Sequence, residues 1–571
     1  MITRQAVSRP SSWLADVSVM ALLAALLYGV VRVGQHWQAP LQPLVDVDLR
    51  LWALPGYTLL SLLRGVAAYG VSLGLALAYG YTAAHRPRAE RLLLPLLDVL
   101  QSIPVLGFLP GAVLVLVALF PHTNAGLEIA SILMIVTSQV WNLAFSFYQS
   151  LRGIPLELRE ASQLYRFNWW QRFRRVELPA AAVGLAWNSM MAMAGGWFFL
   201  MICESFTLGA QDFRLPGLGA YISVAISQRR ASAILGGLAA MVLMIILVDV
   251  CVWRPVLVWV QKFRMEETAP ALRRDSLILS WLSRSWLTKA AMAGIAHPLS
   301  EWLASRAALP EAAARRAMGG RAAWLWRVLG LVIITAAGCL VLWGVGRLIQ
   351  LLVHLTAAEW RAVLAGAALT CLRVAAAVLL SSLWVIPVGI WIGRSERWCS
   401  RLQPLVQIAA SFPAPMLYPL ILLSLHAVGL TLGIGAVLFM LIGTQWYILF
   451  NVIAGASAVP TDLREAAQAY HFTPAQRWRT IWWPAVFPYL ITGWITAAGG
   501  AWNASIVAEY VAVGPRVSVT TGLGSLISLA AGRGRYDLLS AGVLVMAVLV
   551  VLINRCLWKP LYRLAETRYA Y

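Results

Sequence analysis

Twelve apolar segments, each near or above the length that a helix needs to cross a lipid bilayer, dominate this sequence. A spanning helix requires about 20 residues. With 60% hydrophobic and 12% charged residues, the 571-residue chain has about half the charged fraction of a soluble protein. The sequence therefore predicts an all-α membrane protein with twelve transmembrane helices. The segments lie at residues 13–34, 57–84, 92–120, 126–150, 181–206 and 232–260, and at 324–355, 361–393, 404–429, 431–456, 485–512 and 537–558.

Positive charge is concentrated in alternate loops. The chain has 45 Lys and Arg against 24 Asp and Glu, a formal net charge of +21. A soluble chain with this balance would suggest nucleic acid, but basic cytoplasmic loops explain it in a membrane protein, so no nucleic-acid partner is expected. The bias predicts that both termini are cytoplasmic, although basic residues in 207–231 run against the trend. The first apolar segment is long and lacks a clear small-residue cleavage site, so we expect it to be retained.

The two halves of the chain are copies of each other. An offset of 305 residues aligns residues 155–255 with their counterparts without a gap, and an offset of 309 applies upstream. Six helices per copy is an even number, so both copies should cross the membrane in the same direction, with a pathway at the repeat interface. The offsets pair Arg64 with Arg373, Trp197 with Trp502, Glu204 with Glu509, and Gly217-Leu218-Gly219 with Gly522-Leu523-Gly524.

The repeat divides the chain into three parts. Residues 1–261 form the first repeat, with its core at 60–260, and residues 322–571 form the second, with its core at 370–560. Between them, residues 262–321 hold ten Lys or Arg and five Asp or Glu, too many charges to span a membrane. We expect this part to be a cytoplasmic linker whose short amphipathic segments lie on the lipid surface.

A long basic loop follows the fourth apolar segment of each copy. Residues 157–173 and 462–478 both predict a short amphipathic helix, a turn and a second basic, aromatic helix, and each loop closes on a proline before the next span. Such a loop can be only a solvated face that skims the lipid. Two copies in register favour a docking element on which a cytoplasmic partner acts.

These loops resemble the EAA loop of ABC importer permeases. Glu160-Ala161-Ser162 and Glu465-Ala466-Ala467 match its opening, and Leu178-Pro179 and Trp483-Pro484 match its close, but Arg166 and His471 replace its glycine. Because glycine is the permissive residue in such a turn, both substitutions bear on its geometry. In that family the loop forms a coupling helix that seats in a groove of the ATPase subunit. The coupling residues implied by the resemblance are Glu160, Ala161, Arg166, Glu465, Ala466 and His471.

The resemblance is closest to the permeases for nitrate, sulfonate, taurine and bicarbonate. It implies a fused type I ABC importer permease with two parallel six-helix repeats in a bacterial inner membrane. It also implies two cytoplasmic ATPase subunits, a periplasmic or lipid-anchored binding protein, alternating access and a small organic or inorganic anion as substrate. An ion-coupled secondary transporter would also explain parallel repeats with intramembrane charges, but not the paired loops. The sequence does not identify the substrate.

No catalytic or metal centre is expected in this chain. A phosphate-binding loop needs a Lys between Gly and Ser or Thr, and none of the three lysines stands in that context. ATP and Mg²⁺ should therefore be bound by the ATPase subunits. The six cysteines include no Cys-x-x-Cys pair, and no His and Glu occur at metal-ligand spacing, so neither a disulfide framework nor a metal site is indicated.

Four ionisable residues within the apolar segments predict two ion pairs. Arg64 and Arg373 lie about two turns inside their segments, and Glu204 and Glu509 lie near the outer ends of theirs. A charged group in a span is costly, so it usually pairs or lines a polar cavity. We expect the pairs Arg64–Glu204 and Arg373–Glu509 in the outer half of the membrane. Fixing helix packing and lining the translocation pathway both remain possible roles.

Several further residues are candidates for the lining of the pathway, each with a structural alternative. The two tryptophans can line the pathway or pack between helices. The Ser-x-Pro motifs can break a helix or only kink it, and the two glutamines can bind substrate or join neighbouring helices. Phe198 pairs with Asn503 and Ile103 with Phe412, so an asymmetric pathway is expected. The candidates are Ser102, Gln139, Trp197, Glu204, Ser411, Phe412, Gln445, Trp502, Asn503 and Glu509.

Overall fold

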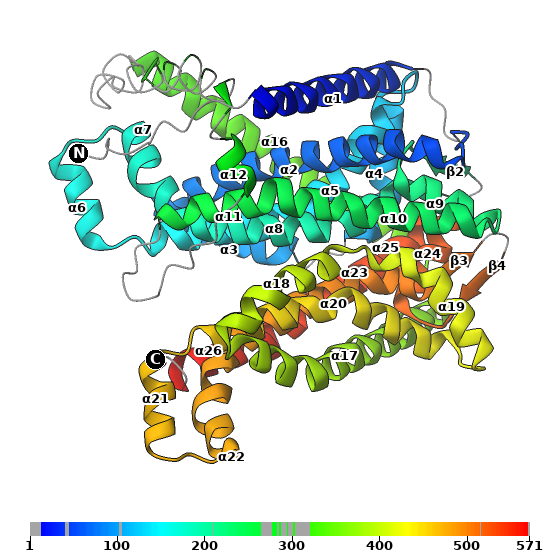
Figure 1. Ribbon diagram of the computed structural model, residues 1–571. Helices are drawn as coiled ribbons and strands as arrows, with labels where there is room; N and C mark the ends of the chain where they lie inside the picture. Colours follow the sequence, from blue (N-terminus) through cyan, green and yellow to red (C-terminus); the bar gives the residue numbers. More distant parts are fainter. Residues whose placement is uncertain are drawn as a thin grey trace.

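The computed structural model describes residues 13–39, 45–101, 105–208, 211–263, 277–282, 320–513 and 516–568, with a few single positions between 285 and 302. Helices dominate both repeats (Figure 1). The first repeat contains α1 (Trp13–Gln38), η1 (Leu51–Ala53), α2 (Leu54–His85), α3 (Pro87–Leu100), α4 (Val105–Leu119), α5 (Ala125–Arg152), α6 (Leu156–Leu164), α7 (Trp169–Arg172), η2 (Phe173–Glu177), α8 (Leu178–Cys203), β1 (Ser205–Leu208), β2 (Gln211–Arg214), α9 (Leu218–Ser227), α10 (Ala231–Val248), η3 (Asp249–Trp253), α11 (Arg254–Val260) and η4 (Gln261–Phe263).

The second repeat follows the same order of elements after the short linker helix α12 (Leu277–Leu282). It contains α16 (Gly320–Val353), α17 (Ala357–Gly393), α18 (Glu396–Ser411), η6 (Ala414–Leu417), α19 (Tyr418–Ala427), α20 (Leu432–Ser457), α21 (Thr461–Ala469), α22 (Pro474–Arg477), η7 (Trp478–Trp482), α23 (Trp483–Ala508), β3 (Tyr510–Val513), β4 (Arg516–Val519), α24 (Leu523–Gly532), α25 (Tyr536–Ile553), η8 (Asn554–Trp558) and α26 (Lys559–Arg568).

Helices occupy all twelve apolar segments, but not every segment is one straight span. In the described part, seven helical runs are long and apolar enough to cross a membrane, and an eighth is obtained if one bent pair counts as a span. That pair bends by 74° between α18 and α19. The bend falls at Phe412, which is extended (φ −71°, ψ 125°) because it precedes Pro413. In the first repeat, the corresponding residues 102–104, including Ser102, lie outside the described residues.

Two small β-hairpins depart from the all-helical expectation. The segments 181–206 and 485–512 end as helices at Cys203 and Ala508, and antiparallel strands follow. β1 pairs with β2 and β3 pairs with β4. Both hairpins lie at one end of the molecule, called here the hairpin end, whereas α6, α7, α21 and α22 lie at the opposite end, called the loop-helix end (Figure 1). The two repeats therefore run in the same direction.

Each repeat is built around three packed helices. α2, α5 and α8 form the centre of the first repeat, and α17, α20 and α23 form that of the second. Contacts between the repeats involve α4 and α18, which lie next to the two Ser-x-Pro motifs: α4 packs against α23 and α25, and α18 packs against α8 and α10. Each of these contacts therefore joins a helix beside a Ser-x-Pro motif to a helix of the other repeat.

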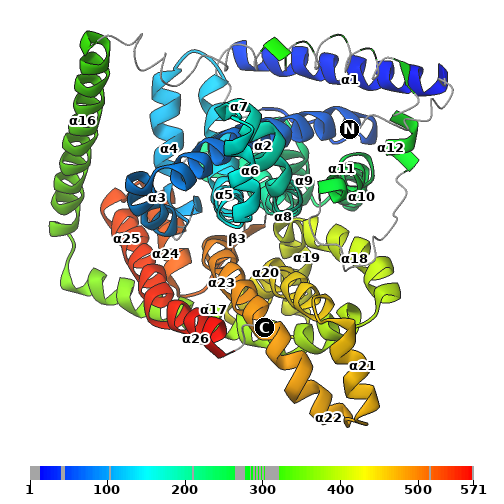
Figure 2. The same cartoon turned by 90° about the vertical axis from the view of Figure 1, so that its left-hand side faces the viewer.

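The first helix of each repeat lies at the periphery. α1 packs against α2 and α5 of its own repeat, whereas α16 packs against α25. Figure 2 shows α1 and α16 along different edges of the molecule. The linker helix α12 contacts α1, and the Ser285 hydroxyl donates a 2.6 Å hydrogen bond to Asp16. This part of the linker lies against α1, and most of the remaining linker is outside the described residues.

Four π-helical turns recur at equivalent places in the repeats. η2 and η7 precede α8 and α23, and η3 and η8 lie within the last spans. A proline stands two residues after the end of each turn, at positions 179, 484, 255 and 560. Because proline lacks an N–H, the carbonyl four residues earlier has no α-helical donor, and the wider turn accommodates the gap. The same backbone deviation is thus present in both copies.

Candidate translocation pathway and coupling helices

A buried ion-pair network joins α2, the end of α8 and the start of α9 in the first repeat. Arg64 pairs with Glu204, whose side chain is fully buried. The Ser61 hydroxyl donates to Glu204 at 2.6 Å and accepts from the Leu218 N–H, and the Gly219 N–H donates to Glu204 at 2.7 Å. The carboxylate therefore has an Arg, a hydroxyl and a backbone donor, which is what burial of a charge requires.

The second repeat contains the same network. Arg373 pairs with Glu509 at 2.7 Å, Thr370 takes the place of Ser61, and the Gly524 N–H donates to Glu509 at 2.8 Å. In both copies the first glycine of the Gly-Leu-Gly motif lies against the carboxylate, so that a Cβ atom at Gly217 or Gly522 would overlap it. The motif and the glutamate are therefore parts of one packing unit.

One buried carboxylate of the first repeat was missed by the sequence reasoning. Glu128 of α5 accepts two hydrogen bonds from Arg64, 2.8 Å from Nε and 2.7 Å from Nη2, and only 4% of its side chain is exposed. His36 of α1 lies 3.7 Å from Glu128. The gapless match at offset 305 extends upstream of residue 155 through α5, where Trp141 aligns with Trp446, and it places Gly433 opposite Glu128. The sequence could have identified Glu128, because it is an acidic residue inside the apolar segment 126–150.

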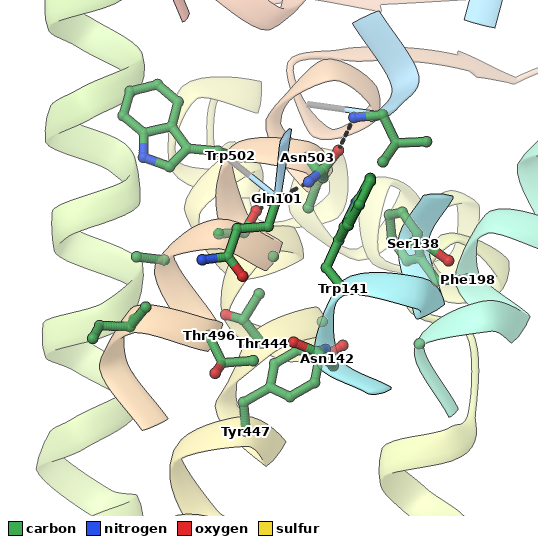
Figure 3. Close-up of a pocket in the computed structure, with 18 of the residues that line it drawn as sticks. Gln101, Ser138, Trp141, Asn142, Phe198, Thr444, Tyr447, Thr496, Trp502 and Asn503 are labelled. Carbon is green, nitrogen blue, oxygen red and sulfur yellow. Dashed lines mark hydrogen bonds between the residues drawn. The ribbon is translucent and has the colours of Figure 1, made fainter. Parts of the chain in front are cut away.

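A central cavity of about 200 Å³ lies between the two repeats. All of the described residues that line it are uncharged. They include amides, hydroxyls and large aromatic rings from both repeats, which converge on one space in Figure 3. The residues labelled there are Gln101, Ser138, Trp141, Asn142, Phe198, Thr444, Tyr447, Thr496, Trp502 and Asn503. The cavity can therefore offer hydrogen bonds and aromatic faces without a fixed charge.

Asn503 links the repeats at the wall of this cavity. Its side-chain oxygen accepts a 2.7 Å hydrogen bond from the N–H of Val105, the first residue of α4, as the dashed line in Figure 3 shows. The first N–H groups of a helix have no partner within the helix, so an Asn side chain from another element can act as the cap. The counterpart of Asn503 in the first repeat is Phe198, which has no acceptor in its side chain.

The candidate lining residues divide into two groups. Phe412, Trp502 and Asn503 line the central cavity. Trp197 and Ser411 instead line a separate crevice of about 10 Å³ between the repeats. The difference between the tryptophans has a local cause: the ring of Trp197 packs closely over Gly65, whose counterpart at offset 309 is the larger Val374.

The other candidates are enclosed by protein. Gln139 is fully buried and accepts a 3.0 Å hydrogen bond from Ser72 of α2, so it joins two helices. Gln445 is also buried, and neither glutamine lines the central cavity or the crevice. The carboxylates of Glu204 and Glu509 are taken up by the ion-pair networks. Cavity residues that the sequence reasoning missed include Trp141, Asn142, Tyr447 and Thr496.

A second cavity of about 650 Å³, called here the hairpin-end vestibule, is also lined by both repeats. It continues the line of the central cavity along α8 and α23, because residues 194–199 and 495–504 line the central cavity and residues 201–206 and 506–511 line the vestibule. Arg214 and Arg533 line the vestibule, and its described lining contains no Asp or Glu. The vestibule is therefore a basic space in line with a neutral cavity.

The candidate coupling helices α6 and α21 are held to their repeats by equivalent arginines. Arg159 donates to the Leu151 carbonyl at 2.8 Å, and Arg464 donates to the Ala456 carbonyl at 3.1 Å. Capping boxes start the following short helices, with Asn168 and Gln171 in one copy and Thr473 and Gln476 in the other. In both loops, therefore, an arginine holds the first short helix to the end of the preceding span, and a capping box starts the second short helix.

The glycine of the EAA pattern is replaced without loss of the turn. Arg166 has φ 47° and His471 has φ 51°, so both non-glycine residues adopt the left-handed conformation. This conformation costs an L-residue about 1–2 kcal/mol relative to the right-handed one. Nearby, Glu160 and Glu465 are exposed, Ala161 is half-buried and Ala466 is exposed. Leu164 and Tyr165 are 83% and 77% exposed, and Tyr470 is 77% exposed.

Two stretches of the chain, residues 70–263 and 385–557, match one family model, described as the binding-protein-dependent transport system inner membrane component. The chain belongs to this family. The double match confirms the expected fused permease with two copies of the same unit. A permease of this family is a transport subunit located in the inner membrane.

Individual relatives of this permease agree with the family assignment. A putative ABC transporter permease of Methanocaldococcus jannaschii is 30% identical over 32% of this chain and 65% of the relative. The putative aliphatic sulfonates permease of Bacillus subtilis is 26% identical over 26% of this chain and 51% of the relative. The glycine betaine/proline betaine permease of Escherichia coli is 26% identical over 37% and 57%. The chain thus spans between half and two thirds of their lengths. Other relatives carry the names of taurine, bicarbonate and nitrate permeases.

Proposed function

We propose that this chain alone forms the complete pathway of an ATP-driven ABC importer, which moves a small anion by alternating access. The observation that carries the proposal is that both repeats line both cavities, one directly in line with the other. In a transporter built from two parallel repeats, a site at their interface can be exposed to either side as the repeats move against each other.

The partners follow from the two ends of the molecule. The loop-helix end is the cytoplasmic end, and α6 and α21 each seat in one of two ATPase subunits, which bind ATP and Mg²⁺. Their exposed faces carry Glu160 and Glu465 with apolar neighbours such as Leu164 and Tyr470. A periplasmic or lipid-anchored binding protein docks at the hairpin end. Both chain termini are then cytoplasmic, and lipid surrounds the outer helices.

An anionic substrate suits the charge distribution along the pathway. Arg214 and Arg533 raise the concentration of anions in the hairpin-end vestibule. The central cavity then offers neutral donors such as Asn142, Thr444 and Thr496. Conduction requires a site that binds well enough to admit the substrate and weakly enough to release it, which a neutral cavity provides. The aromatic rings of Trp141 and Tyr447 would also accept a quaternary ammonium group, so a betaine is the competing substrate class.

Uptake into proteoliposomes that contain the chain with its ATPase subunits and binding protein tests the coupling proposal. ATP-dependent uptake should be lost in the double variant Glu160→Arg with Glu465→Arg, because reversed charges oppose docking on both coupling helices. Binding-protein association at the opposite end should persist. Uptake driven by an ion gradient without ATP would instead support a secondary transporter. Full ATP-dependent uptake by the double variant would remove α6 and α21 from the coupling mechanism.

The same preparation tests the substrate class with taurine, nitrate and glycine betaine as competing solutes. The variants Arg214→Gln and Arg533→Gln should slow anion uptake, and the difference should shrink at high salt because screening weakens exposed charges. Arg361→Gln is the matched control, since Arg361 is exposed on α17 and does not line the vestibule. Selective uptake of glycine betaine, with no effect of either vestibule variant, would rule out the anion assignment.

A further inference from the structure

The two ion-pair networks differ at one position, and the arginine of the second repeat is the more exposed of the two. Arg64 holds two carboxylates, those of Glu204 and Glu128, and 3% of its side chain is exposed. Within the described part of the chain, Arg373 contacts a single carboxylate, that of Glu509, and 13% of its side chain is exposed. Gly433 stands where the first repeat has Glu128. The second arginine therefore lacks the carboxylate that its counterpart binds through two nitrogens.

Polar atoms surround the place that this missing side chain would occupy. A Cβ atom built on Gly433 would lie 3.4 Å from the Thr520 hydroxyl, 3.7 Å from Nη2 of Arg373 and 3.7 Å from the Thr431 hydroxyl. Thr520 accepts a 3.1 Å hydrogen bond from Arg373 Nη2. Thr431 precedes α20 but its side chain makes no capping hydrogen bond. An Arg and two hydroxyls thus converge on one small space.

The backbone at this place also favours a negatively charged ligand. Gly433 is the second residue of the 26-residue helix α20, so the space lies at the start of that helix. The first N–H groups of a helix and its dipole favour a negative charge. The nearby Glu509 does not exclude an anion, because Arg64 in the first repeat holds two carboxylates at once in the same arrangement. The internal repeat therefore supplies an occupied version of this site.

The surroundings leave the space open. In the first repeat His36 of α1 lies beside Glu128, and α1 packs on α2 and α5. In the second repeat the corresponding helix, α16, packs on α25. Thr431 and Thr521 are exposed, and Gly433 is half-buried. A ligand can therefore reach Arg373 from outside at the hairpin end.

We propose that Arg373, Thr431, Thr520 and the start of α20 form an oxyanion site in which an external ligand replaces the missing Glu128 carboxylate. The ligand is a phosphate-like oxyanion, supplied either as a free ion or as a lipid headgroup. The Arg guanidinium and phosphate match each other in charge and geometry. The site is separate from the two cavities of the pathway, because none of these residues lines either cavity.

Thermal unfolding of the whole chain in dodecyl maltoside micelles, which contain no phosphate, tests the site without any partner subunit. Inorganic phosphate, with chloride at equal ionic strength as the reference, should raise the unfolding midpoint to a plateau, since a ligand that binds the folded state stabilises it. Phosphatidylglycerol added to the micelles supplies the lipid source in a second arm. A response to phosphate identifies a free-ion site, and a response to phosphatidylglycerol alone identifies a headgroup site.

Variants at Gly433 give the decisive comparison. Gly433→Glu restores the carboxylate of the first repeat, so the midpoint should rise without ligand and no longer respond to either probe. Gly433→Ala is the matched control and should keep the response, because its Cβ makes only ordinary contacts. Thr431→Ala should raise the phosphate concentration that gives half of the midpoint shift about tenfold, because one hydrogen bond to a charged group is lost. A wild-type protein that responds to neither probe overturns the site, as does an unchanged response in both Gly433→Glu and Thr431→Ala.

Discussion

At the residue scale, the most consequential interaction is the bridging of Arg64 by two buried carboxylates. Removing one partner of a buried ion pair costs about 3–5 kcal/mol, because the remaining charge is left without compensation. Arg64→Gln leaves both Glu128 and Glu204 unpaired, whereas Glu204→Gln leaves Arg64 paired with Glu128. We therefore expect Arg64→Gln to lower thermal stability more than Glu204→Gln does, and the double variant to recover part of the loss. Strictly additive losses in this double-mutant cycle would contradict the pairing.

The left-handed residues of the two EAA-like loops give a second prediction at this scale. Replacing Arg166 and His471 by glycine should remove about 1 kcal/mol of backbone strain at each turn. Hydrogen exchange of residues 157–177 and 462–482 should then become slower. Another turn of this chain has a left-handed arginine in one repeat and a left-handed glycine in the other: Arg229 has φ 53° and its counterpart Gly534 has φ 66°. Faster exchange in the glycine variants would show that the side chains themselves stabilise the turns.

Single residues also show what the sequence could and could not provide. The pairs Arg64–Glu204 and Arg373–Glu509 follow from charge, depth in the membrane and the repeat, and they are present in the structure. The part played by Glu128 depends on how α5 is turned toward α2. The separation of Trp197 from Trp502 depends on whether a glycine or a valine lies opposite. Helix rotation and neighbour size are tertiary properties, so these assignments required the structure.

At the scale of elements, the cap that Asn503 places on α4 predicts how firmly the repeats hold together. Asn503→Ala should lower stability by about 1 kcal/mol, the usual effect of losing a helix cap. Asn503→Asp should retain the stability, because a carboxylate accepts the same hydrogen bond and interacts favourably with the helix start. Thermal unfolding of both variants measures this. Equal losses in the alanine and aspartate variants would indicate that the amide group serves another purpose.

The elements themselves were predictable to different degrees. Long apolar segments identify helices reliably because each must satisfy its backbone hydrogen bonds within the bilayer. The hairpin strands are four residues long and closely follow apolar helices, so the hydrophobic pattern does not change enough to predict them. The bend between α18 and α19 has a local sequence cause, Pro413, but the sequence does not give its 74° angle or the packing of α18 against the first repeat.

At the scale of the whole molecule, the chain connecting the repeats should be dispensable for assembly. The repeats contact each other through α4 with α23 and α25 and through α18 with α8 and α10, none of which involves the linker. Cutting the chain within residues 268–275, which lie outside the described residues, and co-expressing the halves should give a complex that co-purifies through a tag on one half. Its uptake should equal that of the intact chain. Assembled but inactive halves would assign an active role to residues 262–321.

The joining of the two copies in one polypeptide has an evolutionary consequence. In a homodimer one codon specifies both halves, so a substitution that helps on one side must also be tolerated on the other. Here the two halves have accumulated different residues at matching places: Glu128 opposite Gly433, Phe198 opposite Asn503, and Gly65 opposite Val374. When the two copies are fused in one chain, one half can change without changing the other. The fusion also ensures that each transporter contains one half of each kind. Each position in one half of this permease can therefore mutate while its counterpart in the other half stays the same.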